Sequence, residues 1–282
     1  MADELRTGET AGNTVEIRIA QRMWEELLSR MPDTGLERVR ALLDVVAGRL
    51  EPEMQPMQGR QDRWFMPGLP SAPWLSRAPF EELAAALESH YDELRSEVER
   101  ESASTRFRPY GLAEDEPPVP RPNFPPGWQE VKLWDGIAPT THVLRLSAAA
   151  RVLRDVLERE RLMKQFTFLA MSPGTRLPPH FDRFNWLVSM HMGIVVPLGC
   201  GLRVADDIRS WEEGKCIFFD NSFQHEAWNE GDSQRIVLAV HLAHPDLTRT
   251  ERQALQIILT RHLRLAAVGP GALAAWATEN EH

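Results

Sequence analysis

The chain has 282 residues, of which 43% are hydrophobic and 26% charged, and its formal net charge is −9. This composition is that of an ordinary globular protein and excludes a largely disordered chain. The negative charge and the lack of a basic cluster argue against nucleic-acid binding. No apolar run approaches the roughly 18 residues that a membrane-spanning helix needs.

The N-terminal residues and the cysteines indicate the compartment. Residues 1–21 lack a basic start, an apolar stretch and a small-residue cleavage site, so we expect no secretory signal. Cys200 and Cys216 are the only cysteines. Two cysteines favour an intracellular, cytoplasmic protein without a disulfide framework, and they exclude zinc held by three or four thiolates.

The chain opens with two helical patterns. Apolar residues repeat at helical spacing over about residues 23–31 and again over 36–50, on either side of the breaker PDTG at 32–35. We predict two antiparallel helices. Their apolar stripes are expected to be core or a subunit contact, and a homodimer through these helices is a candidate assembly.

The next segments alternate between helix and irregular chain. Residues 63–74 (RWFMPGLPSAPW) predict an ordered crossing segment, and Pro79 starts a helix expected to run from Phe80 to Val98. Seven prolines between Pro109 and Pro126 exclude a regular helix, so this segment is either an ordered loop over the barrel or a substrate lid.

Two strands and two helices complete the flanking elements. Residues 128–134 and 141–146 have strand patterns, and Ser147 is expected to cap the following helix. Near the C-terminus, Thr248 and Glu251 fit a capping box for a last amphipathic helix, which GPG at 269–271 would end.

Residues 166–245 hold most of the features that indicate chemistry. Five of the nine histidines lie between positions 180 and 244, among short β-forming apolar runs broken by Pro, Gly and Asp. Many short strands, rather than helices, give this pattern. We therefore predict a mainly β barrel centred on a metal, with supporting helices on both sides in the sequence.

Three residues in this stretch have the chemistry of metal ligands. His180 and Asp182 are separated by one residue, so on a strand both side chains would point to one face. With His225 they form the two-histidine, one-carboxylate set of the facial-triad iron site, which leaves coordination positions open. A single His-x-Asp pair arises often by chance. Arg235 adds weight, because its guanidinium could pair with a carboxylate of 2-oxoglutarate.

Longer segments of the chain resemble the aspartyl/asparaginyl β-hydroxylase family. They are SPGTRLPPHFD, MHMGIVVPLGCGLRV, WEEGKCIFFDNSFQHEAWN and RIVLAVHLAHP, within about residues 165–247. The resemblance implies a double-stranded β-helix (jelly-roll, cupin-like) fold and the use of Fe(II), 2-oxoglutarate and O2. We expect an N-terminal helical extension (1–58), a jelly-roll domain (59–247), and a C-terminal helix and tail (248–282).

The resemblance also implies roles for single residues. His180 and His225 match the family's iron-binding histidines, and Arg235 matches the residue that anchors a carboxylate of 2-oxoglutarate. His191 matches a histidine that contacts the cosubstrate, and Met171 lies at a pocket-lining position.

The chain differs from the best-known animal members of the family at two positions. Asp182 stands where they carry a glycine, so this chain offers the full triad found in bacterial relatives that act on small substrates. Ser189 stands where they carry a substrate-binding arginine, which weakens the case for a peptide aspartate as the substrate.

Other side chains in the stretch give weaker signals. His241 and His244 would face opposite sides of a strand, so we expect no second metal site and regard both as bystanders. Trp186, Trp211 and Trp228 could wall the pocket but are more simply explained as core.

Together these features predict a 2-oxoglutarate-dependent dioxygenase. It would hydroxylate an unactivated C–H bond of an amino acid or amino-acid-derived substrate, free, carrier-bound or peptidyl, with natural-product biosynthesis as a candidate context. Two alternatives stay open: a β-hydroxylase of Asp or Asn in a protein or peptide, and a non-catalytic metal-binding jelly roll. Arg63, Arg183 and Arg203 are the candidate substrate-binding cations.

Overall fold

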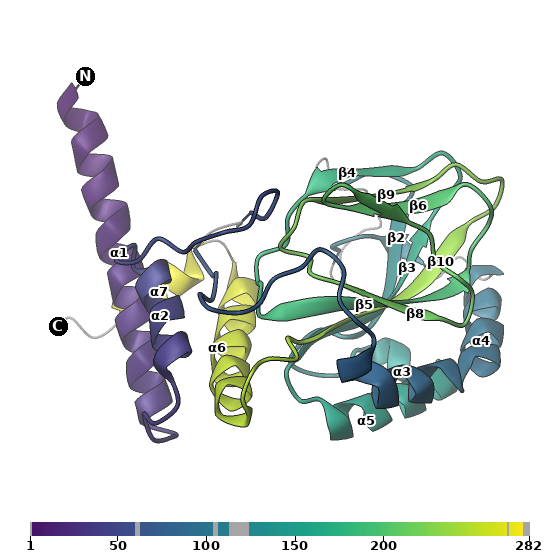
Figure 1. Cartoon of the computed structure of the whole chain (residues 1–282), viewed down its shortest axis with the longest axis horizontal. Coiled ribbons are helices and arrows are strands. Elements are labelled where there is room, and N and C mark those ends of the chain that lie inside the picture. Colours follow the sequence, from purple (N-terminus) through teal and green to yellow (C-terminus); the bar gives the residue numbers. More distant parts are fainter. Residues whose placement is uncertain (1, 60–62, 104–106, 113–123, 270, 279–282) are drawn as a thin grey trace.

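The computed structural model describes residues 2–59, 63–103, 107–112, 124–269 and 271–278. Two antiparallel β-sheets face each other and are flanked by helices on one side and at one end (Figure 1). This arrangement is a double-stranded β-helix, and the predicted fold class is confirmed.

The larger sheet has six strands in the order β1-β2-β3-β10-β5-β8, and the smaller has four in the order β4-β9-β6-β7. Neighbouring strands within each sheet pair antiparallel. The strands are β1 (Arg108–Pro109), β2 (Trp128–Trp134), β3 (Met163–Met171), β4 (Arg176–His180), β5 (Leu187–Val195), β6 (Cys200–Val204), β7 (Asp207–Arg209), β8 (Cys216–Phe219), β9 (His225–Asn229) and β10 (Arg235–Ala243).

The larger sheet buries both of its faces. On β10, Leu238 and Val240 belong to the core on the outer face, whereas Val237 and Ala239 belong to the core between the sheets. This alternation follows from the two-residue period of a strand. Helices α3 (Glu81–Glu88), α4 (Tyr91–Ala103) and α5 (Ser147–Arg159) cover the outer face (Figure 1). Each aliphatic side chain buried there contributes about 2 kcal/mol relative to exposure.

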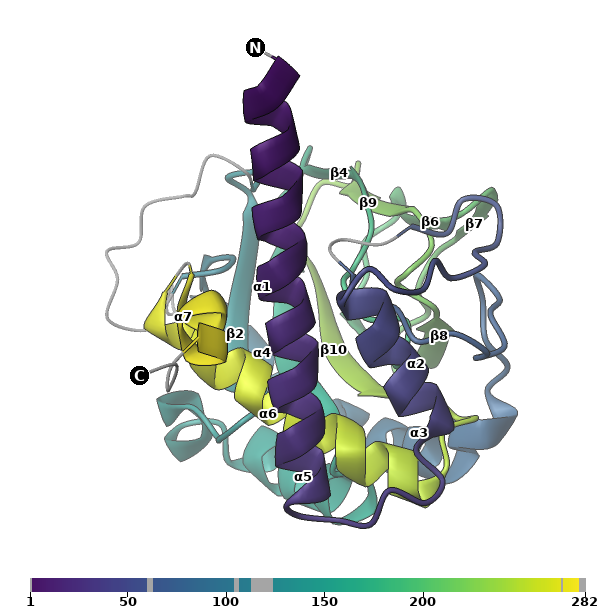
Figure 2. The same ribbon diagram turned by 90° about the vertical axis from the view of Figure 1, so that its left-hand side faces the viewer.

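A helical bundle closes one end of the barrel. Figure 2 shows α1, α2, α6 and α7 gathered at this end, with α2 antiparallel to α1 as predicted. The apolar stripes of the N-terminal helices pack in one core with α6 and with the ends of β5 and β10. Among the described side chains, these stripes are therefore buried within the chain. The bundle helices are α1 (Ala2–Leu28), α2 (Glu37–Val46), α6 (Arg249–Val268) and α7 (Ala272–Thr278).

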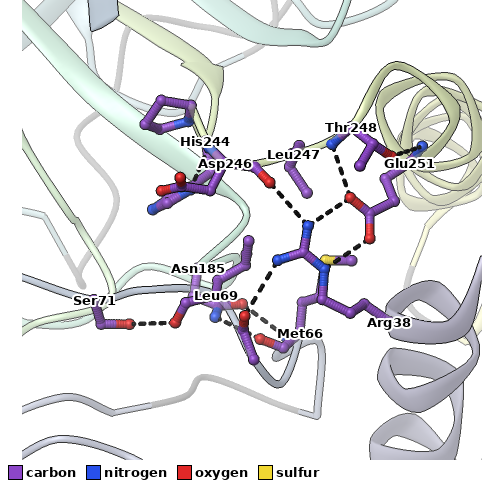
Figure 3. Close-up of polar contacts among 12 residues, drawn as sticks. Arg38, Met66, Leu69, Ser71, Asn185, His244, Asp246, Leu247, Thr248 and Glu251 are labelled. Carbon is purple, nitrogen blue, oxygen red and sulfur yellow. Dashed lines mark hydrogen bonds and ion pairs between the residues drawn. The ribbon is translucent and has the colours of Figure 1, made fainter. Parts of the chain in front are cut away.

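Polar contacts join two helices of the bundle, α2 and α6 (Figure 3). The Arg38 guanidinium on α2 donates to both carboxylate oxygens of Glu251 at 2.7 and 2.6 Å. Glu251 also belongs to the predicted capping box with Thr248, which is present at the start of α6. A bidentate pair of this kind fixes orientation as well as distance, so α2 is locked against the start of α6.

A second contact ties the crossing segment after α2 to the loop that follows β4. The buried Asn185 side chain accepts a hydrogen bond from the Met66 backbone N–H at 2.7 Å and donates to the Met66 carbonyl at 2.9 Å (Figure 3). Asn185 lies three residues after Asp182. The crossing segment therefore supports the loop that carries this carboxylate.

Three local predictions were wrong. Residues 141–144 form a 3-10 turn instead of a strand, because the Thr140 hydroxyl accepts the His142 backbone N–H and caps the turn. The helix predicted from Phe80 to Val98 is interrupted at Ser89 and His90. The Ser89 hydroxyl donates to the Ala86 carbonyl and competes with helix continuation.

The third wrong prediction concerns the start of α5. Ser147 is the first residue of the helix and does not cap it. The cap comes from α4 instead, because the Glu97 carboxylate accepts hydrogen bonds from the N–H groups of Ala148 and Ala149 at 2.6 and 3.0 Å. A carboxylate at this position also interacts favourably with the helix dipole.

Two further observations bear on the sequence analysis. Most of the proline-rich segment from Pro109 to Pro126 lies outside the described residues, which omit 113–123. Within the described parts of the chain, no helix combines the length and apolar character needed to cross a membrane.

His262 is a buried titratable group between the bundle and the barrel. Its ring packs edge-on against Trp64 and Phe184 at centroid distances of 5.1 and 5.6 Å, and Arg183 donates to its Nε2 at 2.7 Å. Burial, and then the charges of Arg183 and Lys164, lower the pKa of His262 from 6.5 to about 4. The folded protein therefore favours the neutral ring.

We predict that His262 makes the protein sensitive to acid. Below pH 6.5 the unfolded chain binds a proton at this position but the folded chain does not. Stability present at neutral pH is thus lost as the pH falls toward 4, by at most about 1.4 kcal/mol per pH unit from this group. Urea unfolding of the parent chain and of His262→Gln between pH 8 and pH 4 should give a shallower loss for the variant. Equal slopes would contradict this assignment, and the data at pH 8 report the packing change alone.

Candidate metal centre and cosubstrate pocket

Strand pairing brings the three predicted ligands together. In the β4–β9 register His180 lies opposite His225, and their ring centroids are 4.1 Å apart. Asp182 follows the end of β4, and its backbone N–H donates to the Asn221 carbonyl at 2.8 Å. One ligand atom from each of His180, Asp182 and His225 lies within 4.8 Å of the other two. This geometry suits a single metal ion.

Hydrogen bonds to carbonyls set the tautomers of both histidines. Nδ1 of His180 lies 2.9 Å from the Pro178 carbonyl, and Nδ1 of His225 lies 2.9 Å from the Phe223 carbonyl. A carbonyl only accepts, so each Nδ1 carries the proton and each Nε2 keeps its lone pair. Metal-binding histidines are commonly oriented in this way.

The charges of the site favour ligand forms at neutral pH. Burial alone would raise the pKa of Asp182, but the positive charge of Lys164, followed by the neighbouring histidines, lowers it to about 2. Burial, and then His180, lowers the pKa of His225 to about 4. An ionised carboxylate and a neutral imidazole are the forms that bind a metal.

A narrow pocket of about 70 Å³ extends from these ligands between the two sheets. Arg235 and Met171 lie opposite each other in the β10–β3 register at its other end. Arg235 is 2% exposed, its guanidinium lies over the Trp211 ring at 4.7 Å, and burial lowers its pKa to about 10. No carboxylate of the described residues lies within ion-pair distance of this cation.

Several buried polar atoms of the pocket have no hydrogen-bond partner. They are Nδ1 of His191, Nε1 of Trp211, Nε of Arg235 and Nδ1 of His241. Burial and then Arg235 lower the pKa of His191 well below its ordinary value, so its ring is neutral. A buried cation and a set of unused donors are costly unless a ligand satisfies them. A small molecule that carries carboxylates, such as 2-oxoglutarate, fits this lining.

The structure corrects the interpretation of His241 as a bystander. His241 lines the same pocket, and its Nε2 lies 3.9 Å from Oδ2 of Asp182. Its position six residues after Arg235 on one strand could have revealed this, because even separations share a face. His244 lies away from the pocket, with Nδ1 accepting the Asp246 N–H at 3.2 Å.

Other residues of the pocket could not be recognised from the sequence. Tyr110 and Gln165 line the pocket, and Asn221 donates to Asp182 from the turn between β8 and β9. Tyr110 stacks on Trp128 at a centroid distance of 3.6 Å. These residues come from separate parts of the chain, and only the fold brings them together.

The remaining candidates lie elsewhere. The three proposed cations, Arg63, Arg183 and Arg203, do not line the described pocket. Arg203 pairs with Glu226 at 2.7 Å, and Arg183 bonds to His262. Trp186 is fully buried in the core next to the bundle, and Trp228 lies under a surface arginine. Of the three tryptophans, only Trp211 therefore contributes to the pocket.

The fold and the site define a class of protein. The chain is a jelly roll with two histidines and one carboxylate gathered at one end of an internal pocket, and this donor set suits a non-haem iron with open coordination positions.

Comparisons with known proteins identify the family. The profile of the Aspartyl/Asparaginyl beta-hydroxylase family matches residues 81–245, and the chain belongs to this family. It is 42% identical over 95 residues to the Aspartyl/asparaginyl beta-hydroxylase of Mus musculus, covering 33% of this chain and 13% of that protein. It is 27% identical over 220 residues to the mouse Aspartate beta-hydroxylase domain-containing protein 2, covering 72% and 60%.

These matches are partial in length. The chain spans 13% and 12% of the mouse and human Aspartyl/asparaginyl beta-hydroxylases. Among solved structures, a Pseudomonas putida prolyl-4-hydroxylase aligns with a TM-score of 0.37 and 18% identity over 57% of this chain and 98% of that chain.

We predict that the three ligands bind one divalent metal. Replacing His225 with Ala should lower the affinity of the full chain for Co(II), measured by calorimetric titration, by at least about 100-fold, because one of three protein ligands is lost. His241→Ala is the matched control, since its ring lies beside Asp182 but is outside the ligand set. Equal affinities for the parent chain and His225→Ala would contradict the assignment.

We also predict that Arg235 binds a carboxylate of 2-oxoglutarate. Arg235→Met should weaken 2-oxoglutarate binding to the Mn(II)-loaded protein on the order of 100-fold, because a buried charge pair is lost. Mn(II) binding should be unchanged, since Arg235 lies at the far end of the pocket. Unchanged 2-oxoglutarate affinity, measured by calorimetry, would count against this role.

Proposed function

We propose that the chain is an Fe(II)- and 2-oxoglutarate-dependent dioxygenase that hydroxylates an unactivated C–H bond of an amino acid or amino-acid-derived substrate. One observation carries the proposal. The pocket combines three ligand groups within 4.8 Å at one end with a buried cation that has no acidic partner among the described residues at the other.

Different residues of the pocket would bind the metal and orient the cosubstrate. His180, Asp182 and His225 would hold Fe(II) and leave adjacent positions open, while Arg235 and His191 would orient 2-oxoglutarate. When bound, iron and 2-oxoglutarate let one oxygen atom of O2 enter the substrate as a hydroxyl and the other enter succinate as CO2 is released. Trp211 and Phe219 exclude water from the pocket, which protects the reaction from side reactions.

The family supports hydroxylation. Its description and the names of the relatives refer to hydroxylases of aspartyl and asparaginyl residues. The non-catalytic alternative, a metal-binding jelly roll, does not account for the buried Arg235 or for the unused donors around it.

The metal end of the pocket favours a polar substrate. Gln165, His241 and Tyr110 line it. Lys164, next to Gln165 in the chain, does not itself line the pocket, but its charge lowers the pKa of Asp182, so it lies near the metal end. It is half-buried with its Nζ 5.8 Å from the centre of the Phe184 ring, and burial lowers its own pKa. A cation beside neutral donors suits a carboxylate, the group that an amino acid supplies.

The alternative substrate is an Asp or Asn side chain in a peptide or protein. The names of the relatives favour it, and Lys164 could serve either kind of carboxylate. Ser189 counts against it, because its hydroxyl is hydrogen-bonded to Asn221 at 3.0 Å and offers no cation.

The test is a turnover assay with Fe(II), 2-oxoglutarate and O2 over free amino acids, N-acetyl amino acids, carrier-thioester forms and short Asp- or Asn-containing peptides. Succinate release and addition of one oxygen atom, read by mass spectrometry, should appear with an amino-acid-type compound. Turnover with peptides alone would favour the alternative. Absence of succinate with every compound, even uncoupled, would contradict the proposal.

We predict that Lys164 recognises the substrate carboxylate. With the active compound found in that assay, Lys164→Gln should raise KM roughly tenfold, because an interaction of about 1.4 kcal/mol in binding is removed. KM is compared at saturating metal, since Lys164 also lowers the pKa of the metal ligand Asp182. Lys132→Gln is the control, since Lys132 is already paired with Glu130 at 3.3 Å. If both variants keep the parent KM, Lys164 has no such role.

A further inference from the structure

Asp182 is held by a residue outside the ligand set. Its side chain is 29% exposed, so packing alone does not fix its rotamer. The Asn221 amide donates to Oδ2 of Asp182 at 2.9 Å, and the Asn221 carbonyl accepts the Asp182 N–H at 2.8 Å. Asn221 is thus hydrogen-bonded to both the backbone and the side chain of Asp182.

The same amide reaches a third residue. Its second N–H donates to the Ser189 hydroxyl on β5 at 3.0 Å, and Asn221 and Ser189 are each 2% exposed. The carboxylate of Asp182 only accepts hydrogen bonds, which settles the orientation of the amide with its nitrogen toward Asp182. Oδ1 of Asn221 is left buried without a hydrogen-bond partner. An unsatisfied buried acceptor lowers stability, which indicates that Asn221 has a role other than stabilising the fold.

The hydrogen bond from Asn221 makes the two carboxylate oxygens of Asp182 inequivalent. Oδ2 is occupied by Asn221, while Oδ1 has no hydrogen-bond partner in the described parts of the chain. One oxygen therefore stays available to a metal as a single ligand atom. A rotation of the carboxylate that turned both oxygens toward the metal would break the bond to Asn221.

The turn that carries Asn221 is anchored independently of Asp182. The Asp220 carboxylate accepts hydrogen bonds from the backbone and the hydroxyl of Ser222 at 2.9 and 2.6 Å, and Gln58 donates to the Ser222 hydroxyl at 2.8 Å. A ligand support must itself be rigid to orient a ligand. This turn meets that requirement.

We infer that Asn221 is a positioning residue that aims Asp182 at the metal as a single-oxygen ligand, and that Ser189 belongs to this support instead of to the substrate subsite. The inference rests on the proposed metal centre. It assigns a role to two polar residues that the proposed reaction otherwise leaves unused.

The test is a double-mutant cycle on metal binding by the whole 282-residue chain. Co(II) alone is titrated under anaerobic conditions into the metal-free parent chain, Asn221→Ala, Asp182→Ala and the double variant, with affinity read by calorimetry and ligand field by visible absorption. Asn221→Ala should weaken Co(II) binding about 10- to 100-fold and alter the spectrum. In the Asp182→Ala background the same change should have little further effect, because the two residues act together.

Two single variants refine the result. Ser189→Ala should weaken binding less than Asn221→Ala, because it removes only the outer contact. Gln256→Ala is the control, since it removes a side-chain amide that donates to Thr260 at 3.1 Å within α6 and does not line the pocket, and it should bind Co(II) like the parent chain. Thermal unfolding of the metal-free proteins separates misfolding from loss of positioning.

The outcomes distinguish the inference from the function on which it rests. If Asp182→Ala binds weakly and Asn221→Ala binds like the parent chain, the role of Asn221 is wrong while the ligand set stands. If Asn221→Ala weakens Co(II) binding equally in the parent chain and in the Asp182→Ala background, the role of Asn221 is also wrong. If Asp182→Ala binds as tightly as the parent chain, Asp182 is not a ligand, and both the ligand set and the inference fail.

Discussion

The pairing of β4 with β9 is the contact on which the site depends. It sets His180 opposite His225 and ends where the chain turns toward Asp182. A slip of one residue would turn each side chain to the other face of the sheet and separate the ligands. The remaining structure supports this register. The smaller sheet holds β9 between β4 and β6, and the crossing segment holds the loop after β4 through Asn185.

The pocket is arranged around two charges of opposite sign, one buried and one partly buried. Arg235 is a cation at one end without an acidic partner in the described chain, and Asp182 is an anion near the other. Burial lowers the pKa values of His191 and His241, and both imidazoles stay neutral. Such a lining would accept a small anion beside a cationic metal, because low local dielectric strengthens both interactions.

Much of this site could be predicted from the sequence, and what was missed has a physical reason. His180, Asp182, His225 and Arg235 carry distinctive chemistry at characteristic spacing, so the residues that the structure brings together could be named in advance. Asn221 and Tyr110 are common residues whose positions depend on turns and on pairing between distant strands. The strand predicted at 141–146 failed because side-chain capping by Thr140 outweighed the β-propensity of the segment.

The central claim is that one iron and one 2-oxoglutarate share this pocket. It is tested most directly by adding 2-oxoglutarate to the Fe(II)-loaded protein under anaerobic conditions and recording visible absorption. Chelation of Fe(II) by the keto and carboxylate oxygens of 2-oxoglutarate gives a charge-transfer band. The account predicts a band that saturates at one 2-oxoglutarate per chain. An iron-loaded protein that shows no band at saturating 2-oxoglutarate would contradict it.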